Sequence, residues 1–247
     1  MISKSQVSFV KSLHQKKYRK EHQLFIVEGY KAVSEFAQSD FGIDSIFYTP
    51  DFSAKVANLS NKRKDYELSP TDLKKISLLQ NPQGVLALVQ MPENQKLQAE
   101  FDDLVLVLDG VQDPGNLGTI IRTADWFGFK QLVCSEDCVE VYNPKVVQAT
   151  MGSLTRVKVN YQNLNELFAA HHLPKYGMLL NGENIFNTVW PQKGFVVLGS
   201  EGNGISEGLL SSITHPLTIP GGQNTESLNV AIAGAICCAE IRRNKLK

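Results

Sequence analysis

The clearest architectural signal in the chain is the stretch LVLVLDGVQDPGNLGTIIRTAD, which spans residues 104–125. Its first five residues form an uninterrupted apolar run, as is typical of a strand that is buried on both faces. A loop rich in glycine and polar residues begins at Asp109, and a helical pattern follows from Asn116. A buried strand that passes through such a loop into a helix is the repeating unit of a parallel α/β sheet.

The same alternation continues along the rest of the chain. Strand-like segments occupy residues 104–108, 131–134, 156–161, 177–180, 195–198 and 217–219. Helix-like segments occupy residues 116–127, 144–153, 164–171, 206–213 and 228–243. This order predicts an α/β fold with a mostly parallel sheet and helices on both of its faces. Such sheets bind ligands outside the carboxyl ends of their strands, so the loops that follow the strands are the candidate site.

The preceding residues predict a second, smaller α/β unit. Strands are expected at residues 24–27, 45–49 and 84–89, and a helix is expected at residues 30–37. Ser69-Pro70 predicts another helix start, with serine as the N-cap and proline at the first helical position. Residues 92–103 are polar and weakly patterned. We therefore predict an N-terminal domain at 1–95, a linker at 96–103 and a larger domain at 104–247.

Composition excludes several classes of protein. The chain has 247 residues, of which 43% are apolar and 20% are charged, and its 25 basic and 25 acidic residues cancel. These values are ordinary for a globular protein and exclude disorder, collagen-like sequence and coiled coils. The four cysteines fit neither a disulfide framework nor a zinc site, so we expect reduced, buried thiols and no metal. With no apolar run long enough to span a bilayer and no secretory signal, we expect a cytoplasmic protein.

Three loops rich in glycine and polar residues follow strands of the larger region. They span residues 109–118, 198–206 and 219–230. In the first, Gly110 and Gly115 have the outer spacing of a nucleotide-triphosphate loop, but Asn116-Leu117 replaces the required Lys-Ser/Thr pair. The glycines of the second run in the order G-x-x-G-x-G, which is the reverse of the dinucleotide fingerprint. The loops therefore disfavour both a nucleotide-triphosphate site and a dehydrogenase.

A single loop of this kind would be explained by tight turns alone, because glycine adopts positive φ readily. Three such loops, each with Asn, Arg, Glu or Ser among the glycines, favour a binding site instead. Backbone amides and carbonyls exposed by glycine can grip a flat heterocycle. An arginine that follows in the helix, as Arg122 does, can hold a phosphate through two hydrogen bonds.

Taken together, the three loops resemble the signature motifs of the SpoU (TrmH) family of RNA ribose 2'-O-methyltransferases, within the SPOUT superfamily. They occur in the same order and with the same spacing. The first carries the Asn and Arg of the family as Asn116 and Arg122, and the second carries its Glu as Glu201. The third carries the Ser-Leu-Asn triplet as Ser227-Leu228-Asn229.

The resemblance implies a SPOUT-type fold, in which the C-terminal segment of the parallel sheet threads a loop to form a trefoil knot. It also implies a homodimer and S-adenosylmethionine as the cofactor, bound among the knotted loops. The residues carried over as cofactor-binding are Leu198, Gly199, Gly202, Ile219, Pro220 and Leu228. One departure is Gly221, where family members often have Met. We expect the loop to tolerate it, because the family holds the cofactor mainly through backbone atoms.

The implied reaction moves a methyl group from a sulfonium to a ribose hydroxyl, which is a poor nucleophile until its proton is polarised or removed. Arg122 is an awkward general base, because the pKa of arginine exceeds about 12. We expect Arg122 to clamp the phosphate beside the target ribose, with the phosphate or water sharing the proton. We expect Asn116 to orient the hydroxyl and Glu201 to fix Asn116 or Arg122. Ser227 and Asn229 complete the predicted catalytic set.

These polar residues also have structural alternatives. Asn116 could cap the helix that follows it, Glu201 could serve only its loop, and Ser227 is a plausible N-cap of the last helix. That helix is rich in small residues, which suits close packing in a core or at a dimer interface. The sequence leaves these alternatives open.

The N-terminal region is similar to the ribosomal-protein-like RNA-binding domain of family members that act on ribosomal RNA. Its first twenty residues carry six bases and no acid, interleaved with Phe9, His14 and Tyr18. A charge run is most often a solvated face, but this pattern also suits phosphate contacts and base stacking. The predicted RNA contacts are Lys16, Lys17, Arg19 and Lys20.

The resulting hypothesis is an S-adenosylmethionine-dependent enzyme that methylates a ribose 2'-hydroxyl of ribosomal RNA, with the large-subunit RNA preferred. The choice of ribosomal RNA depends on the separate N-terminal domain. One alternative is the same reaction on tRNA. Another is an inactive RNA-binding or ribosome-assembly protein, against which the intact set of polar residues argues.

Overall fold

The computed structural model describes residues 2–59, 63–92, 101–222 and 226–245. These form two compact units, and each contains one of the two β-sheets. The first unit combines residues 1–94 with 140–155, and the second combines 95–139 with 156–247. The sequence prediction placed residues 140–155 in the larger domain, whereas in the structure they belong to the first unit.

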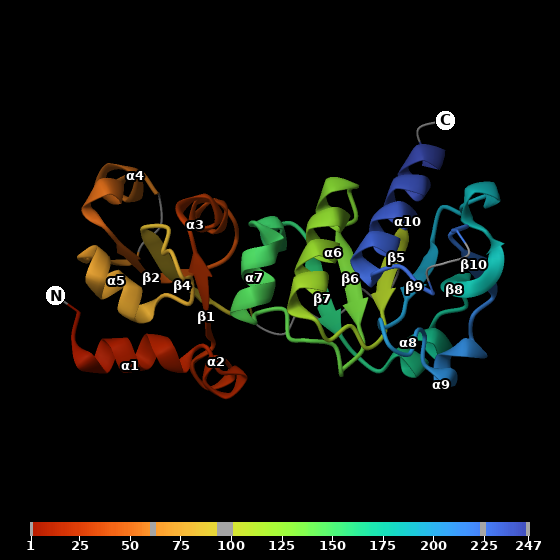
Figure 1. The fold of residues 1–247 in the computed structure, drawn as a ribbon, viewed down its shortest axis with the longest axis horizontal. Coiled ribbons are helices and arrows are strands. Elements are labelled where there is room, and N and C mark those ends of the chain that lie inside the picture. The colour runs from red at the N-terminus through yellow and green to blue at the C-terminus, as the bar shows by residue number, and fades with distance from the viewer. Residues whose placement is uncertain (1, 60–62, 93–100, 223–225, 246–247) are drawn as a thin grey trace. The chain divides into compact units, whose positions relative to one another are not determined.

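The sheet of the first unit has the strand order β1-β4-β2-β3. Its strands are β1 (Leu24–Glu28), β2 (Ile43–Tyr48), β3 (Lys64–Glu67) and β4 (Val85–Gln90). β4 runs antiparallel to both of its neighbours, whereas β2 and β3 are parallel. The helices are α1 (Lys4–Ser12), α2 (Lys16–His22), α3 (Tyr30–Ala37), α4 (Ser53–Ala57), α5 (Pro70–Ile76) and α7 (Pro144–Thr150), with the 3-10 turns η1 (Pro50–Phe52) and η2 (Ser153–Thr155). All carry these labels in Figure 1 where there is room.

Local sequence explains the ends of two of these helices. The helix start expected at Ser69 is confirmed, since its hydroxyl accepts a hydrogen bond from the Asp72 amide at 3.1 Å. α1 was not predicted from the sequence, although a capping box marks its start. In that box the Ser3 hydroxyl accepts from the Gln6 amide at 3.2 Å, and the Gln6 side chain accepts from the Ser3 amide at 3.0 Å. α1 then buries Val10 in the core of the first unit.

The sheet of the second unit has the order β10-β8-β9-β5-β6-β7, and every neighbouring pair is parallel. This confirms the predicted parallel α/β sheet. Its strands are β5 (Leu104–Leu108), β6 (Gln131–Cys134), β7 (Lys158–Tyr161), β8 (Lys175–Asn184), β9 (Gly194–Leu198) and β10 (His215–Thr218). Its helices are α6 (Pro114–Trp126), α8 (Leu164–Ala170), α9 (Glu207–Leu210) and α10 (Val230–Lys245), with the 3-10 turn η3 (Ile185–Asn187).

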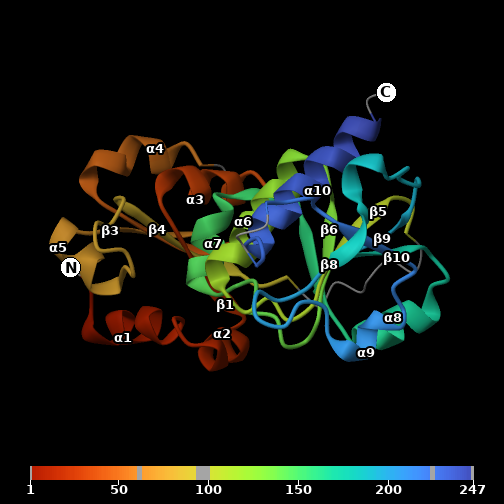
Figure 2. The ribbon, with the colours of Figure 1, turned by 45° about the vertical axis from the view of Figure 1, so that its right-hand side comes forward.

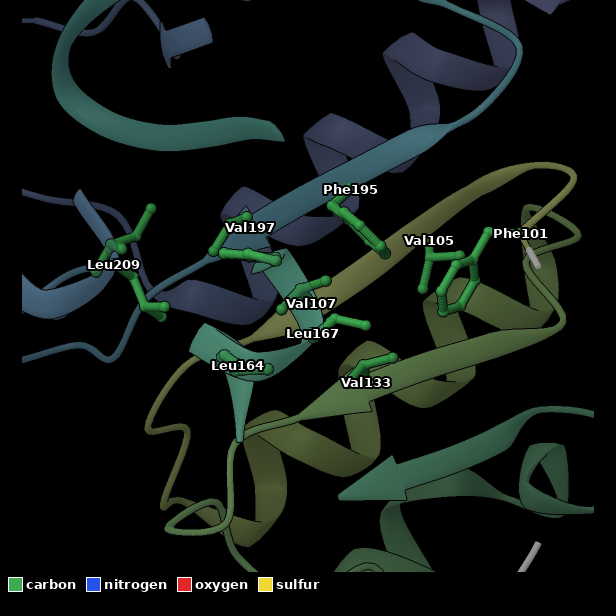
Figure 3. Packing of buried hydrophobic residues seen from close by; sticks show 11 residues of the cluster. Phe101, Val105, Val107, Val133, Leu164, Leu167, Phe195, Val197 and Leu209 are labelled. Carbon is green, nitrogen blue, oxygen red and sulfur yellow. The ribbon is translucent and has the colours of Figure 1, made fainter. Parts of the chain in front are cut away.

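Helices cover both faces of this second sheet. On one face, α8 and α9 pack onto alternate residues of β5 and β9, among them Val107 and Val197 (Figure 3). On the other face, α10 lies beside α6, as Figures 1 and 2 both show, and Gly234 of α10 lies close to the Leu198 side chain. Most of the predicted linker lies outside the described residues. Phe101 within it is 3% exposed and packs in this core, so it belongs to the second unit rather than to a linker.

Candidate active site

The first glycine-rich loop ends where helix α6 begins. The Asp113 carboxylate accepts a hydrogen bond from the Asn116 amide at 2.8 Å and caps the helix, while Pro114 takes its first position. The helix therefore starts two residues earlier than the sequence predicted. As a result, Asn116 lies in the first helical turn, and its side chain is not used as the cap.

The side chain of Asn116 joins the three loops. Its Nδ2 donates to Glu201 Oε1 in the second loop, and its Oδ1 accepts from Asn229 Nδ2 at 3.0 Å at the end of the third. One carboxamide thus uses its donor and its acceptor on two different segments. The structure brings Asn116, Glu201 and Asn229 together at the carboxyl ends of β5 and β9, where a parallel sheet binds its ligands.

Asn229 is held by the helix that it starts. Its Oδ1 accepts hydrogen bonds from the amides of Ala231 at 2.9 Å and Ile232 at 3.3 Å. The cap of α10 is therefore Asn229 and not Ser227, which the sequence had left as an alternative. Because capping occupies the oxygen of Asn229, its amide nitrogen is left to point toward Asn116.

The second loop is tightly folded. Ser200 and Gly204 exchange backbone hydrogen bonds at 3.0 and 2.9 Å, and Gly204 has a φ of +66°. A Cβ atom on Gly199 would lie 2.0 Å from the carbonyl carbon of Gly204, so only glycine fits there. The buried Asp109 carboxylate accepts from the Ser206 amide at 2.7 Å and ties this loop to the first.

A further loop, after β6, supports the first loop. The Ser135 hydroxyl accepts from the Gly110 amide at 2.9 Å, and the Cys138 thiol accepts from the Val111 amide at 3.2 Å. A hydrogen bond from the Cys134 thiol lowers the pKa of Cys138, whereas that bond and burial raise the pKa of Cys134. All four cysteines are free and buried, as expected, and Cys138 helps to hold the first loop in place.

Comparison with known proteins gives this geometry a family. Residues 103–239 match the model of the SpoU rRNA Methylase family, which covers more than half of the chain. The chain belongs to the SpoU rRNA methylase family. Residues 4–87 match a second model, the MRM3-like substrate binding domain. The SpoU match contains all three loops that carried the resemblance.

Individual SpoU relatives are similar over nearly the whole chain. The 23S rRNA (guanosine(2553)-2'-O)-methyltransferase RlmP of Bacillus subtilis is 32% identical over 237 residues, which cover 94% of each protein. A solved structure from Porphyromonas gingivalis, assigned to the TrmH family of RNA methyltransferases, is 40% identical with a TM-score of 0.88 and covers 98% of this chain and 99% of that one. The AdoMet-bound rRNA methyltransferase from Sinorhizobium meliloti is 26% identical with a TM-score of 0.89, over 100% and 98% of the two chains.

Arg122 of this SpoU chain lies on an exposed face of α6. No other described residue makes a hydrogen bond or ion pair with its guanidinium. By contrast, Arg156 binds Asp125 of the same helix through two of its nitrogens, Nε at 3.0 Å and Nη2 at 2.8 Å. Arg122 is therefore free to meet a ligand.

The predicted cofactor residues lie along the second and third loops. Leu198 is buried at the end of β9 and Leu228 is 46% exposed, while Gly202 and Pro220 are exposed. Ser227 is exposed and is not brought into the Asn116 cluster by any contact among the described residues. Residues 223–225 of the third loop lie outside the described residues. The roles of all these residues stay predictions.

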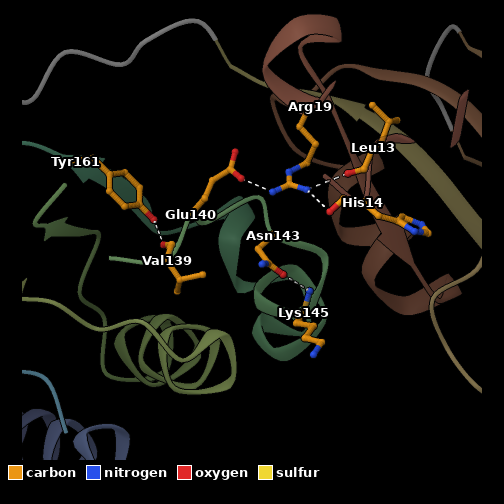
Figure 4. Close-up of polar contacts among 8 residues, drawn as sticks. All are labelled: Leu13, His14, Arg19, Val139, Glu140, Asn143, Lys145 and Tyr161. Carbon is orange, nitrogen blue, oxygen red and sulfur yellow. Dashed lines mark hydrogen bonds and ion pairs between the residues drawn. The ribbon is translucent and has the colours of Figure 1, made fainter. Parts of the chain in front are cut away.

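The basic residues near the N-terminus divide into two kinds. Lys16, Lys17 and Lys20 are exposed on α2, as an RNA contact requires. Arg19 is 2% exposed, and its guanidinium donates to the Leu13 carbonyl at 3.0 Å and the His14 carbonyl at 2.9 Å and also pairs with Glu140 (Figure 4). The prediction that Arg19 contacts RNA was therefore wrong, since this side chain joins segments of the first unit.

Sequence reasoning missed the residues that hold the SpoU loops in place. Asp109, Asp113 and Ser135 stand within or beside the quoted loops but were given no role. For Asp113 a signal was present, because Asp followed by Pro is a common helix start. For Asp109 and Ser135 there was none, because their partners lie 97 and 25 residues away.

Two absences concern the described residues only. They contain no group of three or more His, Cys, Asp or Glu side chains placed to hold a metal ion. Within the same part of the chain, no helix is both long and apolar enough to cross a membrane.

Proposed function

We propose that this chain is an S-adenosylmethionine-dependent methyltransferase that modifies a ribose 2'-hydroxyl of large-subunit ribosomal RNA. The observation that carries the proposal is the Asn116 side chain, which binds Glu201 and Asn229 from two other loops. Membership of the SpoU family supports the reaction, and the similarity to RlmP of Bacillus subtilis supports the RNA class.

The residues present fit S-adenosylmethionine. A Cβ atom on Gly202, Gly221 or Gly222 would meet nothing within 4 Å, so the backbone beside these loops is open to a ligand. Leu228 offers an exposed apolar side chain to a flat heterocycle. We assign the backbone of Leu198, Gly199, Ile219 and Pro220, together with Gly202 and Leu228, to its binding. When bound, the cofactor supplies an electrophilic methyl group.

The chain's own residues position the ribose. Glu201 holds the Nδ2 atom of Asn116, and Asn229 holds its Oδ1 atom, so the carboxamide cannot rotate. This preorganisation fixes the Asn116 carboxamide in the position from which it orients the ribose 2'-hydroxyl. Arg122 binds the adjacent phosphate and brings the hydroxyl into line. The hydroxyl proton passes to that phosphate or to water, because arginine stays protonated. Ser227 contacts the ribose or the phosphate from the third loop.

We also propose that the chain acts as a homodimer with the SPOUT trefoil knot, in the cytoplasm. An exposed apolar surface on neighbouring helices supports dimerisation. Trp126 of α6 is 84% exposed, Ile232 of α10 is 51% exposed, and the two helices pack together. Because Arg122 lies four residues before Trp126, it shares that side of α6 and would act close to the partner.

Methyl transfer tests the proposal directly. Purified chain would be incubated with tritiated S-adenosylmethionine and either ribosomal RNA or tRNA, both from a strain that lacks the gene. We expect label in ribosomal RNA, and we expect it in 2'-O-methyl nucleosides after digestion. Label in tRNA alone would favour tRNA as the substrate. The uncharacterized tRNA/rRNA methyltransferase of Synechocystis, which is 31% identical to the chain, carries both RNA classes in its name. Label in neither RNA would favour an inactive RNA-binding protein.

A further inference from the structure

The first unit contains an open cavity of about 590 Å³ that the proposed methyl transfer does not use. It lies where β2 ends and β4 begins, beside η1 and helix α5. Its volume is within the range of sites for small ligands. The cavity opens broadly to solvent, so a group attached to a long chain could enter it.

One wall of the cavity is aromatic. The Phe52 ring is seated on Gly84, where a Cβ atom would lie 2.3 Å from a ring carbon and where φ is +80°. The Tyr30 ring lies 5.9 Å from the Phe52 ring, and the Lys55 ammonium lies 5.4 Å from the centre of each. Phe52 lines the cavity, whereas Tyr30 and Lys55 stand behind it, with the Lys55 ammonium over the Phe52 ring. A half-buried ring of this kind suits a flat ligand that carries negative charge nearby.

The rim of the cavity is polar. It offers the hydroxyl of Thr71, the carboxamide of Gln83 and the carboxylate of Asp51, together with the ammonium of Lys74. Among the described residues, Thr71, Lys74 and Gln83 have no side-chain hydrogen-bond partner. The neighbouring Lys75 differs, because its ammonium donates to the Asp72 carboxylate at 2.7 Å. Donors, acceptors and a cation therefore stand uncommitted around an aromatic wall.

We propose that this cavity binds a single unpaired base of the RNA substrate. The base stacks on Phe52, and its polar edge bonds to Gln83, Thr71 and Asp51, while Lys55 and Lys74 contact flanking phosphates. The base must be unpaired, because a base inside a duplex exposes neither its face nor its pairing edge. The match of residues 4–87 to a substrate binding domain agrees with this occupant. The inference rests on the proposed function only in that the ligand is RNA.

The test measures RNA affinity without the cofactor. One fluorescent probe is a hairpin RNA with an apical loop of randomised sequence, and the other is a duplex of the same stem without a loop. One variant is Phe52→Leu, which keeps an apolar side chain against Gly84. The other two, Gln83→Ala and Lys74→Ala, change residues on the exposed rim. Lys75→Ala is the matched control, because that ammonium is already bound to Asp72. Circular dichroism checks that every variant folds.

We expect wild type and Lys75→Ala to prefer the hairpin. Phe52→Leu should lose about five- to hundredfold in hairpin affinity, as loss of one base stack does, with little change for the duplex. Gln83→Ala should weaken hairpin binding as well, and Lys74→Ala should lower the salt dependence of that binding by about one phosphate contact. Equal affinity for hairpin and duplex, or a folded Phe52→Leu variant with wild-type hairpin affinity, would overturn the inference.

This outcome is independent of methyl transfer. If wild type methylates no RNA but Phe52→Leu loses the hairpin preference, the base site stands and the proposed enzyme does not. If wild type methylates ribosomal RNA and Phe52→Leu binds both probes normally, the enzyme stands and the base site is refuted.

Discussion

At the scale of single residues, the site depends on how Asn229 divides its two polar atoms. The oxygen caps helix α10, and the nitrogen donates to Asn116 at 3.0 Å. The cap and the site contact therefore share one side chain. The sequence offered Ser227 as the residue in which a cap and a site role coexist, whereas the structure places both roles in Asn229.

Replacing Asn229 with Asp separates the two roles. A carboxylate caps a helix as well as a carboxamide does, so we expect the free energy of unfolding to stay within about 0.5 kcal/mol of wild type. The donor to Asn116 is lost, however. The Asn116 carboxamide cannot flip to compensate, because its oxygen would then face the Glu201 carboxylate. We expect methyl transfer to fall at least about tenfold. Denaturant unfolding and an initial-rate assay would test this, and an Asn229→Asp variant with full activity would contradict it.

Arg122 and Arg156 serve as a test residue and its control. Arg122 belongs to helix α6, and Arg156 pairs with Asp125 of the same helix. We expect Arg122→Ala to lower turnover by about 10²- to 10³-fold and to leave cofactor affinity nearly intact, because its role is to hold the RNA phosphate. Arg156→Ala removes an exposed ion pair with Asp125, which is worth only about 0–1 kcal/mol, so its turnover should match wild type. Calorimetric titration with S-adenosylhomocysteine would give the affinity. A large loss of cofactor binding in Arg122→Ala would refute this division of roles.

At the scale of elements, the second loop depends on one glycine for its shape. In Gly199→Ala the new Cβ atom would meet the backbone at Gly204 and Ile205, and we expect a loss of about 1–3 kcal/mol in stability. Gly202→Ala, three residues later, meets nothing within 4 Å and should unfold close to the wild-type denaturant midpoint. Equal midpoints for the two variants would show that the second loop relaxes without cost.

Helix α2 provides the test of the RNA contacts. Its three exposed lysines, Lys16, Lys17 and Lys20, can be replaced by Ala together while Arg19 is kept, since that guanidinium is buried. If each lysine contacts a phosphate, the slope of log affinity against log salt should shrink by about two. Deletion of the whole basic segment would be a poor test, because α1 buries Val10 in the core. An unchanged slope would assign these lysines to a solvated face.

Elements were predictable where the local pattern was strong. The strands at 104–108 and 131–134 and the helix at 30–37 occur with the expected bounds, because each is a distinct apolar run or a regular helical repeat. β3 was missed, since three of its four side chains are exposed and charged. The loops were found, and the contact of Glu201 with Asn116 was one of the two that the sequence offered. The hydrogen bond from Asn229 to Asn116 was not predicted, because its partners lie 113 residues apart.

At the scale of the whole molecule, the course of the chain was the least predictable feature. Residues 140–155 lie between two strands of the second sheet in sequence but pack with the first unit. There, the Tyr142 ring lies 4.7 Å from the Phe25 ring and is tilted against it, and Glu140 pairs with Arg19. Nothing local distinguishes this helix from those that cover the second sheet. Only its partners, more than a hundred residues earlier, decide where it lies.

The central claim is that the three glycine-rich loops form one binding site for a methyl donor. Crystals of the chain grown with S-adenosylhomocysteine would test it most directly. We predict electron density for the ligand against the backbone of residues 198–204, 219–222 and 228. This density should lie at the carboxyl ends of the strands, where Asn116, Glu201 and Asn229 meet. Density elsewhere on the chain, or calorimetric titration without any binding, would contradict the account.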